Sequence, residues 1–458
     1  MYQSKTDNYH LLTEAPVGRV ILHLALPTML SMLVTSIYNL TDTWFVGRIS
    51  TQATAAIGVA FPVMSVIQAI GFFFGHGSGN YISRRLGARD TANAGAMATT
   101  GFVYAFVMGL VVACVGHLFL KPLCLALGST PTILPYSLQY VGIILWGAPF
   151  MTASLVLNNQ MRFQGNAAYA MVGVVSGAVL NVLLAPLFIF VLNMGVKGAA
   201  VATVVCQLFS FCLLVYMDGR GNNLRIHPRR FRLNVSLLKE IVRGGTPSLS
   251  RQGLACLSTM LLNLVAGRYG DAAIAGMSIV TRLSFLIFAL LLGFGQGFQP
   301  VCGFNFGAGL YRRVISGFWL CVRLGTLFLS VCALLGFIWA PEIVHLFRHD
   351  PAVVEVGANA LRWQLVVFPC IAFCTISNMT LQTVRYSARA TLLASSRQGL
   401  FFLPALFILP HFFGLSGLEA CQAVADFLTF LLALPLMLSV IGKWKKIVDR
   451  KTGAAIAG

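Results

Sequence analysis

The stretch that decides the fold runs from Gly75-His76-Gly77 to Leu86-Gly87-Ala88, inside a long apolar segment. The pattern returns 220 residues later as Gly295-Gln296-Gly297 followed by Phe306-Gly307-Ala308. Other landmarks keep the same offset: Pro27 and Pro247, Pro149 and Pro369, Asn158 and Asn378. One register across all of these positions indicates that an ancestral unit of roughly 200 residues was duplicated.

The composition is that of a membrane protein. Apolar residues make up 57% of the chain, charged residues only 10%, and the mean hydropathy is +0.81. A soluble domain carries about 25% charged residues. Apolar stretches long enough to cross a bilayer, for which about 20 residues suffice, occur at 20–42, 54–78, 92–118, 132–158, 168–192, 198–217, 242–266, 274–298, 314–340, 354–382, 392–411 and 417–440.

These stretches are too long and too evenly apolar for barrel strands, so the sequence predicts an all-α membrane protein with twelve transmembrane helices. The repeat divides them into two six-helix bundles. Because each repeat has an even number of spans, both enter the membrane from the same side, and a parallel pseudo-two-fold axis along the membrane normal relates them. Repeats of this kind place a transport pathway at the interface between the halves.

The domain boundaries follow from the repeat. We expect an N-terminal six-helix lobe at 1–217, a cytoplasmic linker at 218–240, a C-terminal six-helix lobe at 241–442 and a cytoplasmic tail at 443–458. The linker is the longest polar stretch, and basic residues cluster around Arg229 and Arg230. It serves either as a topology anchor or as a site for anionic lipid head groups.

The net charge of +19 reflects topology. With the N-terminus in the cytoplasm, most of the 32 lysines and arginines fall in cytoplasmic connections. The outer connections hold Arg48, Lys121, Lys197, Arg268 and Arg348. This asymmetry follows the positive-inside rule and predicts a multi-pass protein with both termini in the cytoplasm. It argues against nucleic-acid binding.

Signatures of soluble enzymes are missing from the sequence. It contains no Walker loop, no strand-linked glycine-rich nucleotide fingerprint, no His-Glu-x-x-His and no Gly-x-Ser-x-Gly. No segment could hold a nucleotide domain, so active transport would draw on an ion gradient. The eleven cysteines show neither metal nor disulfide spacing. We therefore expect no enzyme, no catalytic residue, no metal and no cofactor beyond a coupling ion, H⁺ or Na⁺.

Two acidic residues stand out because they lie inside apolar segments, Asp42 and Asp426. A charge at membrane depth costs about 2.5–3.5 kcal/mol on insertion scales, so such a residue is by default a functional hypothesis. Asp42 could exchange a proton, a sodium ion or a cationic substrate; the alternative is a capped, hydrated residue at the outer end of its helix. For Asp426, a structural partnership with a nearby arginine and a role in transport are both open.

Several amide, aromatic, methionine and arginine residues in the spans are candidates for a substrate cavity. Asparagines in spans commonly form hydrogen bonds between helices, whereas rings and thioethers suit the recognition of flat lipophilic cations. Arg397, within Ser395-Ser396-Arg397-Gln398-Gly399, is placed to face a cavity. The candidates are Asn158, Met161, Phe150, Met260, Phe285, Asn378, Arg397 and Asp426.

The chain resembles a known family at several motifs. Tyr38 and Asp42-Thr43-Trp44-Phe45-Val46-Gly47-Arg48 lead to Ala55-Ala56-Ile57-Gly58, then to Gly75-x-Gly77-x-Gly79 and Arg85-Leu86-Gly87-Ala88. Together these motifs resemble the first two helices of the multidrug and toxic compound extrusion (MATE) family. Gly295-Gln296-Gly297-Phe298-Gln299-Pro300 and Gly303-Phe304-Asn305-Phe306-Gly307-Ala308 resemble its bacterial MepA-like branch. The resemblance covers nearly the whole chain.

The resemblance implies a cation-coupling site in the N-terminal lobe. Family members use an aspartate of the first helix, which matches Asp42, and the other matching positions are Tyr38, Tyr140, Asn181 and Thr203. Many members carry a second aspartate four residues after the asparagine, where this chain has Ala185. A single carboxylate weakens the case for tight sodium binding and favours a proton-coupled cycle through Asp42.

The resemblance also implies the function, an antiporter that exports amphipathic, cationic organic compounds in exchange for protons or sodium. Its partners would be such small molecules and the lipid bilayer, its location the bacterial cytoplasmic (inner) membrane, and its working unit a monomer. One alternative is a flippase for lipid-linked saccharides from a related superfamily, with a more cationic cavity built on Arg251, Arg362 and Arg397. The other is a non-transport intramembrane enzyme or receptor-like protein.

Overall fold

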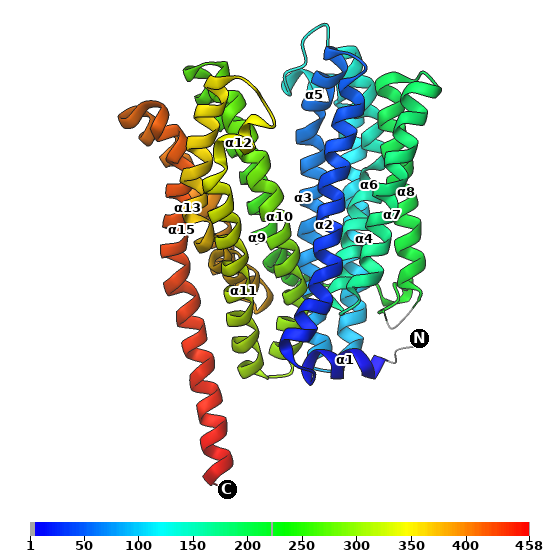
Figure 1. Cartoon of the computed structure of the whole chain (residues 1–458). Coiled ribbons are helices and arrows are strands. Elements are labelled where there is room, and N and C mark those ends of the chain that lie inside the picture. The colour runs from blue at the N-terminus through cyan, green and yellow to red at the C-terminus, as the bar shows by residue number, and fades with distance from the viewer. Residues whose placement is uncertain (1–4, 221–222, 458) are drawn as a thin grey trace.

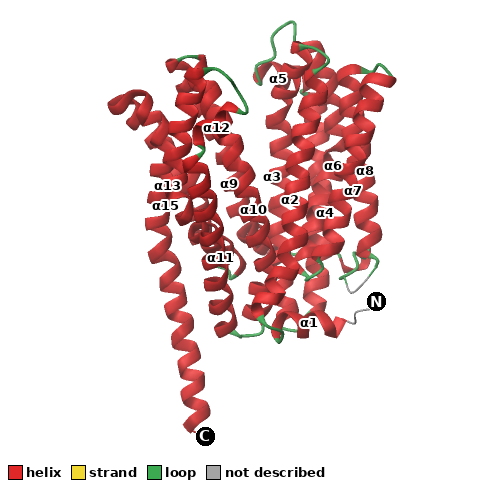
Figure 2. Ribbon diagram, in the orientation of Figure 1, coloured by secondary structure: helices red, strands yellow, loops and turns green. Residues whose placement is uncertain are grey.

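A computed structural model describes residues 5–220 and 223–457. The side chains of residues 5–7, 39, 40, 42, 43, 51, 54 and 451–457 lie outside the described part. Figure 2 shows helices and connecting loops throughout the described chain, without a strand. The predicted all-α fold is confirmed.

The first half holds eight α-helices and a π-helical turn. They are α1 (Lys5–Thr13), α2 (Val17–Gly47), α3 (Thr51–Gly87), α4 (Thr91–Leu118), α5 (Leu120–Ala126), α6 (Leu134–Phe163), α7 (Ala167–Pro186), the π-helical turn η1 (Leu187–Val191) and α8 (Gly195–Asp218). The long members α2, α3, α4, α6, α7 and α8 coincide with the six spans predicted for this half.

The second half begins after a short turn in the linker, η2 (Pro228–Arg230). Its elements are α9 (Val235–Ala266), η3 (Gly267–Tyr269), α10 (Asp271–Gly307), α11 (Tyr311–Ile338), α12 (Ala340–His345), α13 (Pro351–Thr383), α14 (Ser387–Ser395), the π-helical turn η4 (Ser396–Leu400) and α15 (Phe402–Ala457). Within α15, Gly414 leaves helical geometry with φ of 59°. This kink separates the last two predicted spans.

Ten helical stretches of the described chain are long and apolar enough to cross a membrane. Two differences reconcile that number with the twelve predicted spans. First, the stretch from Ser387 to Arg450 contains both final spans, joined through the kink at Gly414. Second, α9 is not among the ten, because polar residues such as Arg251, Gln252 and Asn263 lower its hydropathy.

The helices form two bundles that stand side by side, α2 to α8 in one and α9 to α15 in the other (Figure 1). Corresponding contacts recur in both. Asn158 in α6 donates a hydrogen bond to the carbonyl of Ala170 at 3.0 Å, and Asn378 in α13 donates one to the carbonyl of Ala390 at 2.7 Å. The two donors are 220 residues apart in the sequence, and so are the two acceptors, so the duplicated asparagines form equivalent hydrogen bonds in the two halves.

The halves approach most closely at the end of the bundle where α1 and the last turns of α15 lie (Figure 1), which we call the terminal end. There, Gly87 of α3 lies against the carbonyl oxygen of Phe304, and Gly307 of α10 lies against that of Arg84. A Cβ atom at either glycine would overlap that oxygen. Gly87 corresponds to Gly307 in the repeat, and Arg84 corresponds to Phe304, so each contact is the symmetry equivalent of the other. The pseudo-two-fold axis therefore passes between α3 and α10.

The linker and the tail are more ordered than the sequence suggested. The last part of the predicted linker, from Val235 onward, already belongs to α9, and α15 continues through the predicted tail to Ala457. Residues 223–234 dock on the first half: the backbone N–H of Leu224 donates to Oε1 of Gln164 at 2.6 Å, and Asn166 donates to Asn223 at 2.6 Å. Trp444, early in the tail, is buried in an apolar cluster to which both halves contribute.

Candidate functional site

The predicted cation-coupling residues lie toward the end of the first half opposite the terminal end, which we call the far end. Asp42 belongs to the last turns of α2, but its side chain lies outside the described part of the structure. Val46, one turn later in α2, is fully buried in the same apolar cluster as Tyr140 of α6 and Ala185 of α7. The helix α2 packs against α7, so the backbone near Asp42 lies on the same side of the first half as Ala185.

Asn181 and Thr203 are also buried in this half. Thr203 donates to the carbonyl of Ala199 within its own helix at 3.0 Å. The side-chain Nδ2 of Asn181 has no hydrogen-bond partner among the described residues, although it is shielded from solvent. A buried amide donor without a partner is unfavourable by about 1–3 kcal/mol. This amide is thus available to a neighbouring acid or a ligand.

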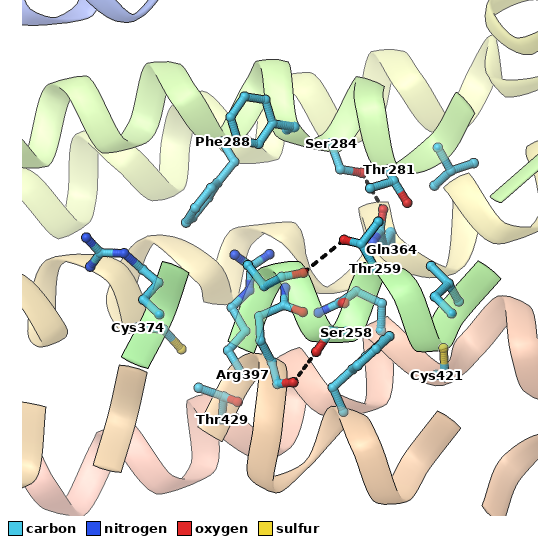
Figure 3. A pocket seen from close by; sticks show the side chains of 18 of the residues that line it. Ser258, Thr259, Thr281, Ser284, Phe288, Gln364, Cys374, Arg397, Cys421 and Thr429 are labelled. Atoms are coloured by element: carbon cyan, nitrogen blue, oxygen red, sulfur yellow. Dashed lines mark hydrogen bonds between the residues drawn. The ribbon is translucent and has the colours of Figure 1, made fainter. Parts of the chain in front are cut away.

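The second half contains a cavity of about 220 Å³, which we call the C-half cavity. It is lined by α9, α10, α13, α14, η4 and α15. Ser284 of α10 donates to Oε1 of Gln364 of α13 across one wall (Figure 3). Ser258 of α9 donates to the carbonyl of Gln398, which is exposed by the wider π-helical turn η4. These polar atoms give the cavity several fixed dipoles.

A buried ion pair lies beside the C-half cavity. Arg397 Nε donates to Oδ1 of Asp426 at 2.8 Å, and Gln422 Nε2 donates to the same oxygen at 2.8 Å. The Asp426 side chain is 1% exposed and that of Arg397 21%. The guanidinium carbon of Arg397 lies 4.4 Å from the ring centroid of Phe288. Of the two roles that the sequence left open for Asp426, the ion pair with Arg397 corresponds to the structural partnership with a nearby arginine.

The predicted substrate residues do not all share one site. Phe285, Asn378 and Arg397 line the C-half cavity. Asp426 is not a lining residue and lies behind Arg397, while Met260 is half exposed and does not line the cavity. The other three belong to the first half: Asn158 bonds to Ala170, Met161 is fully buried, and Phe150 contacts Phe106 and Phe211.

The sequence analysis missed Glu419. This residue of α15 is 5% exposed and lines the C-half cavity. It lies seven residues before Asp426 and three before Gln422, so all three share one face of the helix. That spacing was the signal available in the sequence, but the position of Glu419 near the predicted end of its span concealed it.

A second missed feature is a hydrogen-bonded network where the two halves meet. Arg162 of α6 donates to Gln296 of α10 and lies 3.3 Å from Nε2 of His76 in α3. His76 Nδ1 is 3.0 Å from the hydroxyl of Ser248 in α9, which accepts from Gln382 of α13 at 2.8 Å. His76 and Gln296 are repeat equivalents, as are Arg162 and Gln382. The opening Gly-x-Gly motif thus carries the residues that join the halves.

Comparison with known proteins explains the duplicated geometry. A model of the MatE family matches residues 27–187 and again residues 247–408. The second match starts 220 residues after the first, which is the offset found in the sequence. Together they cover more than half of the chain. The chain belongs to the MatE family. Its two halves are two copies of the unit that defines this family.

Relatives match along nearly the whole length of the chain. Multidrug export protein MepA of Staphylococcus aureus (strain MRSA252) is 27% identical over 434 residues, covering 94% of this chain and 95% of that protein. Multidrug export protein MepA of Staphylococcus haemolyticus (strain JCSC1435) is 26% identical over 438 residues, covering 95% and 96%. The predicted resemblance to the MATE family and its MepA-like branch is confirmed.

Solved structures share the MatE-family fold. One is described as the outward-facing conformation of a multidrug resistance MATE family transporter of the MOP superfamily, with 24% identity, a TM-score of 0.91 and coverage of 97% of this chain and 100% of that chain. A transporter from Pyrococcus furiosus Vc1 (DSM3638), described as having a binding pocket of reverse polarity, gives 24% identity and a TM-score of 0.90, with coverage of 97% and 99%. Membership in the MatE family, together with the multidrug export relatives, makes the chain a multi-pass membrane transporter rather than an enzyme.

The arginines that supported the flippase alternative do not form a cationic cavity together. Arg397 is neutralised by Asp426, and Arg362 does not line the C-half cavity, its Nε contacting the carbonyl of Phe337 at 3.5 Å. Arg251 remains as a cavity-lining arginine without an acidic partner among the described residues.

Proposed function

We propose that this chain is a secondary active antiporter that exports amphipathic organic cations from the cytoplasm in exchange for protons or sodium. The observation that carries the proposal is that both halves match the MatE family. The closest backbone contacts between the halves lie at the terminal end, which is also rich in basic residues. The relatives named as multidrug export proteins support the export of drugs, and the cationic, amphipathic character of the substrate is part of the proposal.

The proposed orientation in the membrane rests on the charge distribution. The terminal end carries the linker arginines, Arg84, Arg85 and the basic residues of the α15 extension. Basic connections face the cytoplasm in membrane proteins, so the terminal end, with both termini, would face the cytoplasm. The conformation in hand is then closed toward the cytoplasm, and reopening there would require Gly87 and Gly307 to separate from the opposite helix.

The coupling step rests on Asp42. For an ion to drive export, it must change the relative affinity of the two conformations for the substrate. Protonation of Asp42 from outside would neutralise this carboxylate and weaken the binding of a cation, and release of the proton inside would restore it. Each positive charge moving inward through 100 mV supplies about 2.3 kcal/mol. In a one-for-one exchange this gain equals the cost of moving a monovalent cation outward through the same potential, so accumulation of the cation is driven by the proton concentration gradient.

The identity of the ion depends on what surrounds Asp42. Asn181 offers an amide N–H without a partner among the described residues, and we propose that the hydroxyl oxygens of Tyr38 in α2, Tyr140 in α6 and Thr203 in α8 complete the site. Ala185 removes the second carboxylate that tight sodium binding would favour. We therefore propose proton coupling, in a monomer in the bacterial inner membrane, with sodium as the alternative that the test must separate.

The experiment uses inverted membrane vesicles that carry the protein in their membrane, with a fluorescent cationic dye added outside. A proton gradient and a sodium gradient are imposed separately, and dye uptake is measured for wild type, Asp42→Asn and Asp271→Asn. Asp271 is an exposed acid at the start of α10 and serves as the matched control. Uptake driven by protons, lost in Asp42→Asn and kept in Asp271→Asn, is the expected result.

Other outcomes of this experiment are equally informative. Uptake that requires sodium would overturn proton coupling and assign the ion to the oxygens near Ala185. Wild-type uptake rates in Asp42→Asn would remove Asp42 from the cycle. Absence of dye uptake under either gradient would contradict drug export and favour the flippase alternative.

A further inference from the structure

The imidazole of His76 lies at the centre of the network that joins the two halves. We propose that His76 is a proton-sensitive positioning residue: its ring must be uncharged for the halves to close, and a proton taken from the cytoplasm holds them open. The inference rests on the proposed export function and adds a regulation to it, because acid in the cytoplasm would slow the return to the closed conformation.

His76 lies where α3 of the first half and α9 of the second are in backbone contact, and its side chain is 2% exposed. One residue later, Gly77 lies against the carbonyl oxygen of Ile241 in α9, and a Cβ atom there would overlap that oxygen. Gly245 of α9 lies in the same way against the carbonyl oxygen of Phe73. The ring is therefore closed off from cytoplasmic water until α3 and α9 separate.

The hydrogen-bond partners of His76 determine its protonation state in the closed conformation. Nη2 of Arg162 lies 3.3 Å from Nε2 of His76. A guanidinium has donors but no acceptor, so Nε2 must carry a lone pair and accept. A neutral imidazole has one N–H, so Nδ1 donates to the hydroxyl oxygen of Ser248, 3.0 Å away. That oxygen also accepts from Gln382 at 2.8 Å. The network is thus complete with a neutral ring.

Arg162 is held against His76 while the halves are closed. Its side chain is buried, and it donates to Oε1 of Gln296 in the second half and to Oδ1 of Asn159 at 2.5 Å. A proton on Nε2 would replace the acceptor by an N–H that faces the guanidinium. It would also place two positive charges close together away from water, which is unfavourable. The charged ring is therefore incompatible with the closed network.

The charges that face His76 from the packed helices are positive. They are Arg162 of α6 and Arg251 of α9. The other acidic and basic residues of the helices packed against this part of α3 are exposed or lie at least five residues along their own helix from the network: Arg19, His23 and Asp42 in α2, Arg84 and Arg85 in α3, His117 in α4, Lys239, Glu240 and Arg243 in α9, Asp271 and Arg282 in α10, and Glu355 and Arg362 in α13. Among them, Glu240 is already paired with Arg84 at 3.1 Å. Protonation of the ring would thus add a third positive charge to two arginines.

The repeat shows that the contact between the halves does not require a titratable residue. Gln296 occupies the position of His76 in the second half, and Gln382 occupies that of Arg162. Both glutamines take part in the same network through side-chain amides, which do not titrate. The imidazole is therefore a feature of the first half alone. His76→Gln installs the neutral residue that the other half already uses.

Opening at the terminal end removes the constraints on the ring. Gln296, Ser248 and Gln382 belong to the second half and move away from the first when the halves part. Arg162 then loses its partner in the second half and can turn from the ring, and Nε2 of His76 takes a proton from cytoplasmic water. Closing returns that proton to the same side, so the step adds no net proton transport. Because proton-coupled export brings protons into the cytoplasm, the step acts as a brake when the cytoplasm becomes acidic.

The size of the effect follows from linkage. A proton that binds only the open conformation multiplies the ratio of open to closed protein by one plus the ratio of charged to neutral imidazole. A hydrated imidazole titrates near pH 6.5, so this factor is about 1.1 at pH 7.5 and about 11 at pH 5.5. Acidification between these values should therefore raise the ratio about tenfold.

The test measures the ratio of open to closed protein at pH 7.5 and 5.5. Nitroxide labels at exposed positions 92 and 312 of the purified full-length chain without native cysteines report the distance by pulsed electron paramagnetic resonance. The variants are His76→Gln and Arg162→Gln, and the matched control is His23→Gln, at an exposed histidine of α2. Asp42→Asn separates the effect from the coupling residue. All are also measured with Gly87→Val, which favours the open form. Circular dichroism and gel filtration check that each variant folds.

The ratio should rise about tenfold at pH 5.5 in the otherwise unchanged chain, in His23→Gln and in Asp42→Asn, and stay within about twofold in His76→Gln. Arg162→Gln should reduce the response, because the ring then no longer faces its nearest positive charge. An open population that does not grow at pH 5.5 with or without Gly87→Val, or a full response in His76→Gln, would overturn the inference. Loss of the response in Asp42→Asn would also overturn it, by assigning the proton to that residue.

These outcomes are distinguishable from a failure of the proposed function. A chain that exports dye but shows no response through His76 keeps the proposed function and loses the inference. A chain that responds to pH through His76 but takes up no dye under either gradient would count against the proposed function alone.

Discussion

At the scale of single residues, Asp426 stabilises the second half by neutralising Arg397. Asp426→Asn leaves a guanidinium that is largely buried without its counter-charge, which lowers the free energy of unfolding by on the order of 3 kcal/mol. Arg397→Gln should act in the same direction, and the double variant should lose less than the two single losses added together. Thermal unfolding in detergent measures this. Wild-type stability in Asp426→Asn would contradict the ion pair, and Asp271→Asn is the control.

Arg385 is a second residue with a local consequence. It occupies the repeat position of Gly165, and both have positive φ, 70° for Arg385 and 89° for Gly165. Arg385 also pairs with Glu240 at 2.5 Å, but its side chain is more than half exposed, so the pair contributes little. We expect Arg385→Gly to be more stable than Arg385→Ala by about 1 kcal/mol. Both variants lose the ion pair, so equal melting temperatures would refute the backbone explanation.

Individual site residues were only partly predictable. Asn378 and Arg397 could be assigned to a cavity because polar residues inside spans are rare and demand a reason. Glu419 and His76 were not identified, since their importance depends on which helices face them. Glu419 lines the C-half cavity and His76 contacts Arg162 because of how the helices pack together, and the spacing of residues along one helix does not reveal this.

At the scale of elements, the crossing of α3 and α10 determines whether the terminal end is closed. Gly87→Val or Gly307→Val would place side-chain atoms against the facing carbonyl and push the helices apart. We expect either change to lengthen the distance between nitroxide labels at exposed positions 92 and 312, measured by pulsed electron paramagnetic resonance in a chain without native cysteines.

Because both glycines belong to one symmetric contact, the double variant should move the labels little further than either single one. Gly253→Val is the control, since a Cβ at Gly253 meets no atom within 4 Å. Unchanged distances in both single variants would show that the glycines do not hold the closed state.

The elements themselves were largely predictable because apolar length defines a membrane helix. The exceptions have physical causes. The kink at Gly414 depends on a single positive φ, and the π-helical turns η1 and η4 depend on local backbone geometry rather than on hydropathy. The helical end of the predicted linker, from Val235, and the extension of α15 were missed because both are too polar to be read as spans.

At the scale of the whole molecule, the duplication explains the architecture more fully than composition does. The offset of 220 residues relates the two family matches, the asparagine hydrogen bonds and the glycine contacts at the terminal end. Two similar bundles joined near their symmetry axis can rock against one another without losing their own cores. The halves differ in chemistry, however: the first carries Asp42, and the second carries the C-half cavity with Glu419.

The measurement that tests antiport most directly is ion movement driven by the exported compound. Purified protein is reconstituted in proteoliposomes with a pH indicator or a sodium indicator inside and no initial ion gradient, and a cationic dye is added outside. The account predicts that dye entry drives protons outward, so the interior becomes more alkaline, and that Asp42→Asn abolishes this change. Dye entry without any movement of protons or sodium would contradict the account.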